Sequence, residues 1–190
     1  MAAVPRPVAD PIDVTLRAAG VADAAVLAEL VEALNISEGD PTGYVTPATV
    51  ARDLAAGRIN VLLAEAAGRV VGYCLWHFGY EPTYAASGSY VCDLFVRPEA
   101  RGRGIARRLL AAVAHEAKAE GGCFVWWTAK PGNDVANAFY AKLGAHREPM
   151  LAHAVFDAAF DDLVAEGEAR RARPAVGRVA REPAAAKLDR

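Results

Sequence analysis

The sequence predicts a mixed α/β domain in which helices cover both faces of one central sheet. Three strand-like apolar segments follow one another across short turns, and strand and helix patterns then alternate. Strands joined by hairpins pair antiparallel, whereas a strand–helix–strand unit adds a parallel neighbour. Hydrophobic residues make up 54% of the 190 residues, which is ample for a packed core.

The first third of the chain predicts one strand and two helices. Asp23 is the expected cap of the first helix, and Thr46-Pro47 combines a hydroxyl cap with proline at the first helical position. Gly57 ends the second helix. The expected elements are a strand at 12–17, a helix at 23–35, a loop at 36–45 and a helix at 47–56.

The remaining two thirds predict most of the sheet. Apolar segments flank the turn Ala67-Gly68-Arg69, which is typical of a hairpin. The expected elements are strands at 59–66 and 70–78, a loop at 79–88, a strand at 89–96, a helix to about residue 120, a strand at 123–128, a helix at 134–143, a last strand at 150–156 and a short helix at 157–166.

Composition limits the domain organisation and the partners. We expect a lead-in at 1–11, one domain at 12–167 and a flexible basic tail at 168–190, which holds seven basic against three acidic residues. A net charge of −2 favours neither nucleic acid nor a membrane surface. The three cysteines lie in strand-like segments and indicate reduced, buried thiols, hence a cytoplasmic protein.

One strand–loop–helix segment carries the chemistry. Residues 90–108 read YVCDLFVRPEARGRGIARR. The first turn of a helix exposes unpaired amides and the positive end of the helix dipole, which favours a phosphate. Gly102 and Gly104 allow close approach of the backbone, and Arg101, Arg103, Arg107 and Arg108 add positive charge. A pyrophosphate ligand is one interpretation, and a turn before a salt-bridged helix is the other.

Two better-known phosphate motifs are excluded by spacing. The sequence has no GxxxxGK[ST] segment, which a P-loop requires. The run that starts at Gly102 begins as GxG, but Arg107 stands where a dinucleotide-binding fingerprint has its third glycine.

Two segments resemble signatures of the GNAT superfamily of N-acetyltransferases. Arg101-Gly-Arg-Gly-Ile-Ala106 resembles the acetyl-CoA signature [QR]-x-x-G-x-[GA], and residues 133–145, NDVANAFYAKLGA, resemble the second signature. The resemblance covers about residues 12–156 and is nearest to the diamine/polyamine and thialysine acetyltransferases. It implies a GNAT fold with six to seven strands, splayed between the fourth and fifth.

The resemblance also implies how the co-substrate acetyl-CoA binds, with no metal. The pantetheine arm would pair with a strand edge, and a backbone amide near 94–96 would face the thioester oxygen. Asn133 would contact the cofactor or cap its helix. The implied cofactor-binding residues are Leu94, Phe95, Val96, Arg101, Gly102, Arg103, Gly104, Ile105, Ala106, Arg107 and Asn133.

The resemblance gives Tyr140 the role of general acid toward the departing thiolate, because a phenol stays protonated at neutral pH. The general base is left open. Relatives usually carry a glutamate where this chain has Cys92. Asp93 is adjacent, although alternation places it on the opposite strand face unless a bulge intervenes. A buried filler is one role of Cys92 and a proton relay another. Glu38, Glu81 or His77 could act through water.

Acceptor-binding candidates come from the loops and aromatic segments. Carboxylates would suit a cationic amine, and aromatic rings would offer an apolar or cation–π surface. The candidates are Glu38, Trp76, Tyr80, Glu81 and Trp127, with Tyr84 nearby in sequence.

The sequence therefore predicts an enzyme that transfers acetyl from acetyl-CoA to a primary amine of a small molecule by direct attack. Two other functions stay open. One is acetylation of a protein lysine or N-terminus, and the other is a non-catalytic acyl-CoA-binding module. A homodimer is possible in this family.

Overall fold

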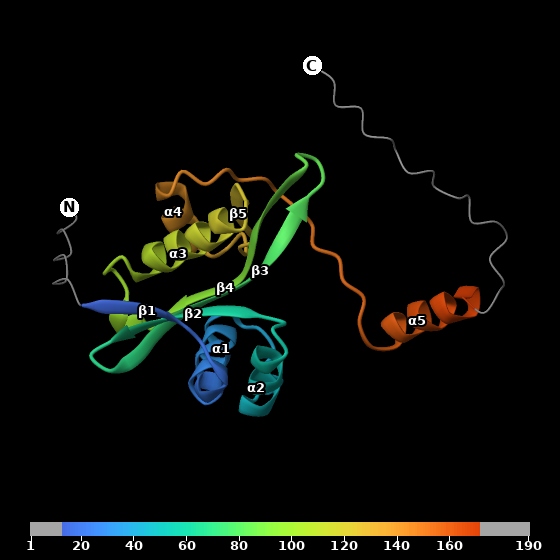
Figure 1. Ribbon diagram of the computed structural model, residues 1–190, viewed down its shortest axis with the longest axis horizontal. Coiled ribbons are helices and arrows are strands. Elements are labelled where there is room, and N and C mark those ends of the chain that lie inside the picture. The colour runs from blue at the N-terminus through green and yellow to red at the C-terminus, as the bar shows by residue number, and fades with distance from the viewer. Residues whose placement is uncertain (1–12, 172–190) are drawn as a thin grey trace, which may run out of the picture. The chain divides into compact units, whose positions relative to one another are not determined.

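The computed structural model describes residues 13–171 and divides the chain into two compact units, 1–138 and 139–190 (Figure 1). The predicted lead-in at 1–11 and the part of the tail beyond residue 171 lie outside the described residues.

The first unit is built on a five-stranded sheet in the order β1-β2-β3-β4-β5. The first four strands pair antiparallel with their neighbours, and β5 joins β4 in parallel. This confirms the mixed sheet. The strands are β1 (Val14–Ala18), β2 (Asn60–Ala66), β3 (Arg69–Glu81), β4 (Ala86–Val96) and β5 (Phe124–Trp127).

The pairing of β4 with β5 is short and ends inside β4. It runs from Gly88 opposite Phe124 to Val91 opposite Trp127, and residues 92–96 of β4 extend beyond it. A Cβ atom added at Gly88 would lie 2.5 Å from the carbonyl oxygen of Phe124, so a glycine is needed where the two strands meet. On this side of β4, residues 88–91 are therefore paired with β5, whereas residues 92–96, here called the open stretch of β4, are not.

A β-bulge lies in β4 where this open stretch begins. Leu75 of β3 is opposite Asp93 and Trp76 is opposite Val91, so Cys92 is the extra residue. Alternation resumes after the bulge, and Asp93 comes to lie on the same sheet face as Tyr73 and Leu75 of β3.

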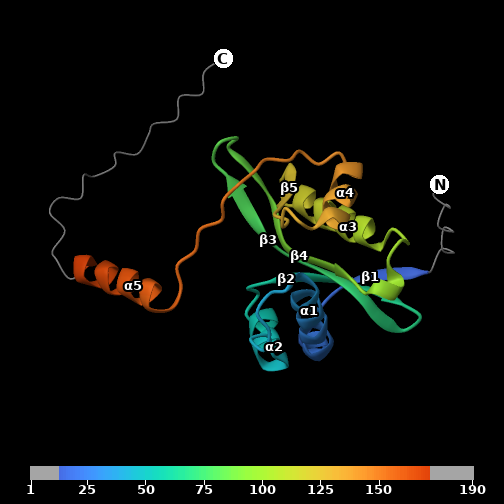
Figure 2. The ribbon, with the colours of Figure 1, turned by 180° about the vertical axis from the view of Figure 1, so that it is seen from behind.

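Helices cover the two faces of the sheet. In both views α1 (Ala24–Glu38) and α2 (Pro47–Ala55) lie on one face and α3 (Ile105–Ala119) on the other (Figures 1 and 2). Two short 3₁₀ turns, η1 (Val21–Asp23) and η2 (Pro98–Ala100), precede α1 and α3.

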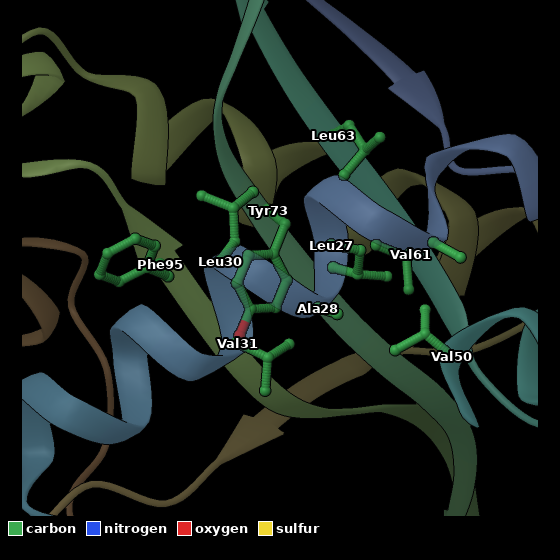
Figure 3. Close-up of a cluster of buried hydrophobic side chains, with 10 residues drawn as sticks. Leu27, Ala28, Leu30, Val31, Val50, Val61, Leu63, Tyr73 and Phe95 are labelled. Atoms are coloured by element: carbon green, nitrogen blue, oxygen red, sulfur yellow. The ribbon is translucent and has the colours of Figure 1, made fainter. Parts of the chain in front are cut away.

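The core between the sheet and α1 is a cluster of buried apolar side chains. Figure 3 shows Tyr73 of β3 and Phe95 of β4 meeting residues of α1. Leu27, Leu30, Leu63 and Tyr73 have no exposed surface. The start of α2 is capped as predicted, because Thr46 Oγ1 accepts from the amide of Thr49 at 3.2 Å.

The second unit holds the end of α4 (Asp134–Lys142) and α5 (Asp157–Arg171). The predicted strand at 150–156 is wrong, because these residues have no regular structure and are exposed. The sheet has five strands instead of the predicted six to seven. A segment with an apolar pattern forms a strand only where a neighbouring strand supplies hydrogen-bond partners for its backbone.

Four local predictions need correction. The loop predicted at 79–88 is mostly hairpin, since β3 continues to Glu81 and β4 begins at Ala86. Helix α1 extends to Glu38, where Gly39 ends it with φ +69°. Asp23 precedes α1 without capping it by its side chain, because Arg17 binds its carboxylate. Finally, only Cys74 is buried, while Cys92 and Cys123 are exposed.

No helix among residues 13–171 is long and apolar enough to span a bilayer.

Candidate active site

The turn after β4 exposes a row of backbone amides. Gly102 and Gly104 have φ of +78° and +74°, and Gly104 directly precedes α3. Across the described residues, the amides of 102–107 meet no protein acceptor, whereas the amide of Arg108 donates to the Gly104 carbonyl. Unpaired amides at the start of a helix bind phosphate oxygens well. This geometry suits a diphosphate.

The four arginines of this turn have different surroundings. Arg101 folds back on β4: its Nε donates to the Val96 carbonyl at 2.9 Å, and its guanidinium lies 5.7 Å from the Phe95 ring centroid. Arg108 donates to the Val14 carbonyl. Arg107 is exposed, and the Nε of half-buried Arg103 lacks a protein partner. Arg103 and Arg107 are therefore the cations available to a ligand.

The open end of β4 is joined to this turn by the short 3₁₀ turn η2. Leu94 is half-buried, whereas the Phe95 and Val96 side chains are 5% and 8% exposed. These side chains anchor the strand in the core, while residues 92–96 have no strand partner on the β5 side among the described residues. A free strand edge can pair with an amide-containing chain as a further strand would.

Asp93 lies in this open stretch in a half-buried setting. Its Oδ2 accepts a hydrogen bond from the hydroxyl of buried Tyr73 at 3.2 Å. Burial raises the pKa of the Asp93 carboxyl above its ordinary value; the Tyr73 hydrogen bond lowers it and the charge of Asp40 raises it. A carboxyl with a raised pKa is suited to accept a proton.

Two cysteines lie beside Asp93. Burial, followed by the Asp93 charge, raises the pKa of Cys74 to about 12. Cys92, at the bulge, is exposed, which excludes the buried-filler interpretation. Partial desolvation and the nearby Asp93 charge raise the pKa of its thiol too, so it is mostly protonated near neutral pH.

The end of α1 meets the segment that follows β5. Asn133 Nδ2 donates to Glu38 Oε1 at 2.8 Å, and Asn133 Oδ1 caps α4 by accepting from the Ala136 amide at 3.0 Å. The helix-capping role is therefore observed. Lys130 Nζ contacts Asp40 Oδ1 at 2.6 Å and the Glu38 carbonyl at 2.9 Å. Glu38 and Asp40 thus lie together, and the charge of Asp40 reaches Asp93.

The structure does not bring the other acceptor candidates together. Trp76 is 5% exposed and belongs to the core, whereas Trp127 is half-buried opposite Val91. Tyr80 and Glu81 lie near the tip of the β3–β4 hairpin. Leu75, the partner of Asp93, and Tyr80 are five positions apart on β3, which corresponds to about 17 Å.

Tyr140 belongs to the second unit. Its ring centroid lies 5.4 Å from that of Phe139, and its carbonyl accepts from the amides of Leu143 and Ala145 as α4 ends. In residues 13–171, no cluster of three or more histidine, cysteine or acidic side chains could hold a metal ion.

One group of side chains was missed by sequence reasoning. His77, Tyr90 and Trp126, from β3, β4 and β5, stand side by side with ring centroids 5.2 and 5.0 Å apart. Strand alternation places Trp126 on the face opposite to Trp127, the tryptophan that was predicted. The signal was therefore present, but only the register shows which residues are neighbours.

Comparison with known proteins identifies the fold. Residues 28–145 match the acetyltransferase (GNAT) family, which is well over half of the chain. The chain belongs to the GNAT family. The family prediction from residues 101–106 and 133–145 is confirmed, and so is the fold class.

The relatives of this GNAT protein differ in their acceptors. A thialysine N-epsilon-acetyltransferase from Bos taurus is 36% identical over 76 residues, which are 40% of this chain. The match spans only 44% of that curated relative. A ribosomal-protein-alanine N-acetyltransferase from Brucella melitensis has a similar structure, with TM-score 0.65 and 19% identity, covering 76% of this chain and all of that one.

A second solved structure bears on the co-substrate. A predicted acetyltransferase from Clostridium acetobutylicum, solved with acetyl-CoA, has TM-score 0.62 and 19% identity and covers 75% of this GNAT chain and 96% of its own. Acetyl-CoA is the co-substrate of GNAT acetyltransferases, which agrees with the expected co-substrate. Likeness at this identity establishes the fold alone.

Proposed function

We propose that this GNAT protein transfers an acetyl group from acetyl-CoA directly to a primary amine of a small molecule. One observation carries the proposal: the open stretch of β4 at 92–96 is followed, after the short 3₁₀ turn η2, by the turn whose amides at 102–107 have no protein acceptor among the described residues. The first feature suits an amide-containing pantetheine arm and the second a diphosphate. Coenzyme A carries both groups in this order.

Each donor-binding residue has a part in this proposal. The diphosphate oxygens are held by backbone amides of the turn and of the first turn of α3, namely those of Gly102, Arg103, Gly104, Ile105, Ala106 and Arg107. Arg101 has a positioning role, because it ties the turn to Val96. A backbone amide between Leu94 and Val96 stabilises the oxyanion that develops on the thioester.

Asp93 is the proposed general base. The acceptor is an ammonium ion at neutral pH and must lose a proton before it attacks. Among the carboxyl and imidazole candidates, Asp93 alone lies in the open stretch of β4, and its pKa is raised. The Cys92 thiol lies in the same stretch but is mostly protonated near neutral pH, so it is the poorer base. Tyr140 is the proposed general acid toward the thiolate, on the strength of its place in the second signature.

Carboxylates support a cationic small-molecule acceptor. Asp93 is close enough to Asp40 for the charge of Asp40 to raise its pKa. Lys130 pairs with the Asp40 carboxylate and donates to the backbone carbonyl of Glu38, whereas the Glu38 carboxylate accepts from Asn133. Glu38, Asp40 and Asp93, here called the acidic wall, outnumber Lys130, the one cation that pairs with them within residues 13–171, and attract an amine by long-range electrostatics. A cytoplasmic location belongs to this proposal, because three free cysteines fit a reducing compartment.

Two experiments test the proposal in sequence. Calorimetry with coenzyme A measures donor binding, and a thiol-release assay with acetyl-CoA measures transfer to polyamines, amino acids, aminoglycosides and peptides. We expect donor binding and transfer to at least one small amine. Absence of coenzyme A binding refutes the whole proposal. Binding without transfer supports a non-catalytic acyl-CoA module, and transfer to peptides alone supports a protein acetyltransferase.

A further inference from the structure

We propose that helix α5 pairs with α5 of a second copy of this chain, antiparallel and through one apolar stripe. The stripe, here called the α5 stripe, consists of Phe160, Leu163, Val164 and Gly167, whose spacing places them on one helix face. The inference is independent of the proposed function, because α5 lies beyond residues 28–145, which match the GNAT family.

The large side chains of the α5 stripe are exposed in the second unit. Phe160 is 53% exposed, Leu163 54% and Val164 43%. A helix of 15 residues is only marginally stable in water by itself, and packing of its apolar face supplies most of its stability. The opposite face carries small side chains such as Ala158 and Ala165. The stripe is therefore the face of α5 that needs a partner.

Gly167 favours another α5 helix as this partner. A glycine inside a helix makes it less stable than an alanine would. An added Cβ atom at Gly167 meets nothing within 4 Å among the described residues, so no contact within the chain requires glycine here. In an antiparallel pair centred between Leu163 and Val164, Gly167 lies opposite the partner's Phe160. The smallest residue of the stripe then receives the largest side chain, as close packing requires.

The charges of α5 select the antiparallel orientation. Its first seven residues, 157–163, hold three aspartates and no basic residue, whereas its last eight hold two glutamates and two arginines. A parallel pair places the two aspartate-rich halves side by side, where they repel each other. An antiparallel pair places each of them beside a neutral half that ends in arginines. Arg170 pairs with Glu166 on its own helix but is still 78% exposed, so it is accessible to the partner.

The same charges disfavour a lipid surface as the occupant of the stripe. Amphipathic helices that bind anionic membranes carry lysine and arginine on their polar face. Helix α5 carries five acidic residues against two basic ones, so such a surface repels it. A self-complementary pattern of size and charge is instead what a symmetric pair of identical helices requires.

The oligomeric state of the full chain tests the inference. We expect sedimentation velocity over a range of concentrations to show a monomer–dimer equilibrium. Leu163→Asp places a charge in the middle of the stripe and should raise the dimer dissociation constant about tenfold or more. Ala165→Asp is the matched control, because it adds the same charge on the opposite face of the helix. It should leave the equilibrium unchanged.

Gly167→Ala gives a sharper test, because its effects on the helix and on the pair have opposite signs. In an isolated helix, alanine raises helix content. In the proposed pair, the added methyl group collides with the partner's Phe160 ring. We expect the dissociation constant to rise about fivefold or more, while circular dichroism of the diluted protein shows no loss of helix. An unchanged or tighter dimer overturns the proposed packing.

Engineered cysteines report the orientation. Cys92→Ser and Cys123→Ser first remove the exposed native thiols. In that background, a mixture of Phe160→Cys and Gly167→Cys chains should form a disulfide between the two kinds of chain on mild oxidation. Phe160→Cys alone should not, because antiparallel pairing separates the two copies of residue 160 by about 10 Å along the helix axis. A disulfide from Phe160→Cys alone means a parallel pair and refutes the inference.

Three further outcomes overturn the inference. A chain that stays monomeric at every concentration, with equal thermal stability in wild type and Leu163→Asp, leaves the stripe without a partner. A monomer that Leu163→Asp destabilises shows that the stripe packs against its own chain. A dimer that Leu163→Asp and Ala165→Asp weaken equally, or not at all, forms through another surface.

Discussion

The buried hydroxyl of Tyr73 donates a hydrogen bond to the half-buried carboxylate of Asp93 across 3.2 Å, from one strand to the next. This contact opposes the effect of burial on the pKa of Asp93. It gives the core a direct influence on the group that we propose as the base.

The first prediction concerns the acidic limb of the pH–rate profile. Activity falls as the pH is lowered and the proposed base is protonated. Because the pKa of Asp93 is raised, we expect this fall to occur at a higher pH than the pKa of an ordinary aspartate would give. Tyr73→Phe removes the contact that lowers this pKa, so we expect the limb to move to still higher pH. The measurement is kcat/KM against pH, and an unmoved limb shows that Asp93 is not the titrating group.

The same carboxyl links stability to pH. A folded-state pKa above the unfolded value stabilises the fold fully below the unfolded pKa, and this stabilisation is lost as the pH rises through the folded pKa. Asp93→Asn removes the titration. The wild type therefore loses this stabilisation between pH 4 and pH 7 and the variant does not. We expect the free energy of unfolding of the variant minus that of the wild type to be larger at pH 7 than at pH 4. Urea denaturation at both pH values measures this, and a constant difference contradicts it.

The second prediction tests the phosphate turn with two matched glycines. Gly104 and Gly68 have φ of +74° and +73°, and an added Cβ meets nothing within 4 Å at either. Alanine at each position therefore costs about 1 kcal/mol from backbone strain alone. We expect equal losses of stability in Gly104→Ala and Gly68→Ala, but weaker coenzyme A binding only in Gly104→Ala. Equal affinities would mean that the turn does not hold the donor.

The third prediction uses the three thiols as reporters. Cys74 is buried with a pKa of about 12, whereas Cys92 and Cys123 are exposed. Iodoacetamide should therefore modify Cys92 and Cys123 in the folded protein and leave Cys74 unmodified. Coenzyme A should protect Cys92, which lies in the open stretch of β4, and leave Cys123 reactive. Mass spectrometry of the peptides gives the result, with Cys123 as the internal control.

The fourth prediction concerns Tyr140. If its hydroxyl protonates the departing thiolate, Tyr140→Phe should lower kcat by about 10²–10⁴-fold with little change in acetyl-CoA affinity. Single-turnover thiol release and calorimetry measure the two quantities. An unchanged kcat removes Tyr140 from the mechanism.

The fifth prediction concerns the contact that joins β4 to β5. Gly88→Ala would place a methyl group 2.5 Å from the Phe124 carbonyl, and we expect a loss of about 1–3 kcal/mol. Gly79, its partner on β3, has open space, so Gly79→Ala should cost far less. Thermal unfolding of both variants gives the comparison, and similar losses would contradict the proposed close approach.

Local signals predicted most of the fold. Thr46-Pro47 marked the start of α2, and the glycines at 102 and 104 marked the turn before α3, because capping and positive φ depend on residues close in sequence. The strand at 150–156 failed for the opposite reason. Its apolar pattern is local, whereas a strand needs partners that no local pattern can supply.

The site was harder to predict because its contacts are long-range. Tyr73 and Asp93 are 20 residues apart, and Glu38 and Asn133 are 95 apart, so no motif pairs them. The bulge at Cys92 is a property of two strands together. Without the register, Trp127 and Trp126 were equivalent, and the cluster of His77, Tyr90 and Trp126 could not be recognised.

The short β4–β5 pairing has a consequence for handling the protein. A strand edge that lacks a neighbour can template the addition of another chain, which is a route to aggregation. In this protein that edge is also where we place the pantetheine arm. Coenzyme A added during purification should therefore keep concentrated samples monodisperse for longer, by occupying backbone groups that would otherwise recruit a second molecule.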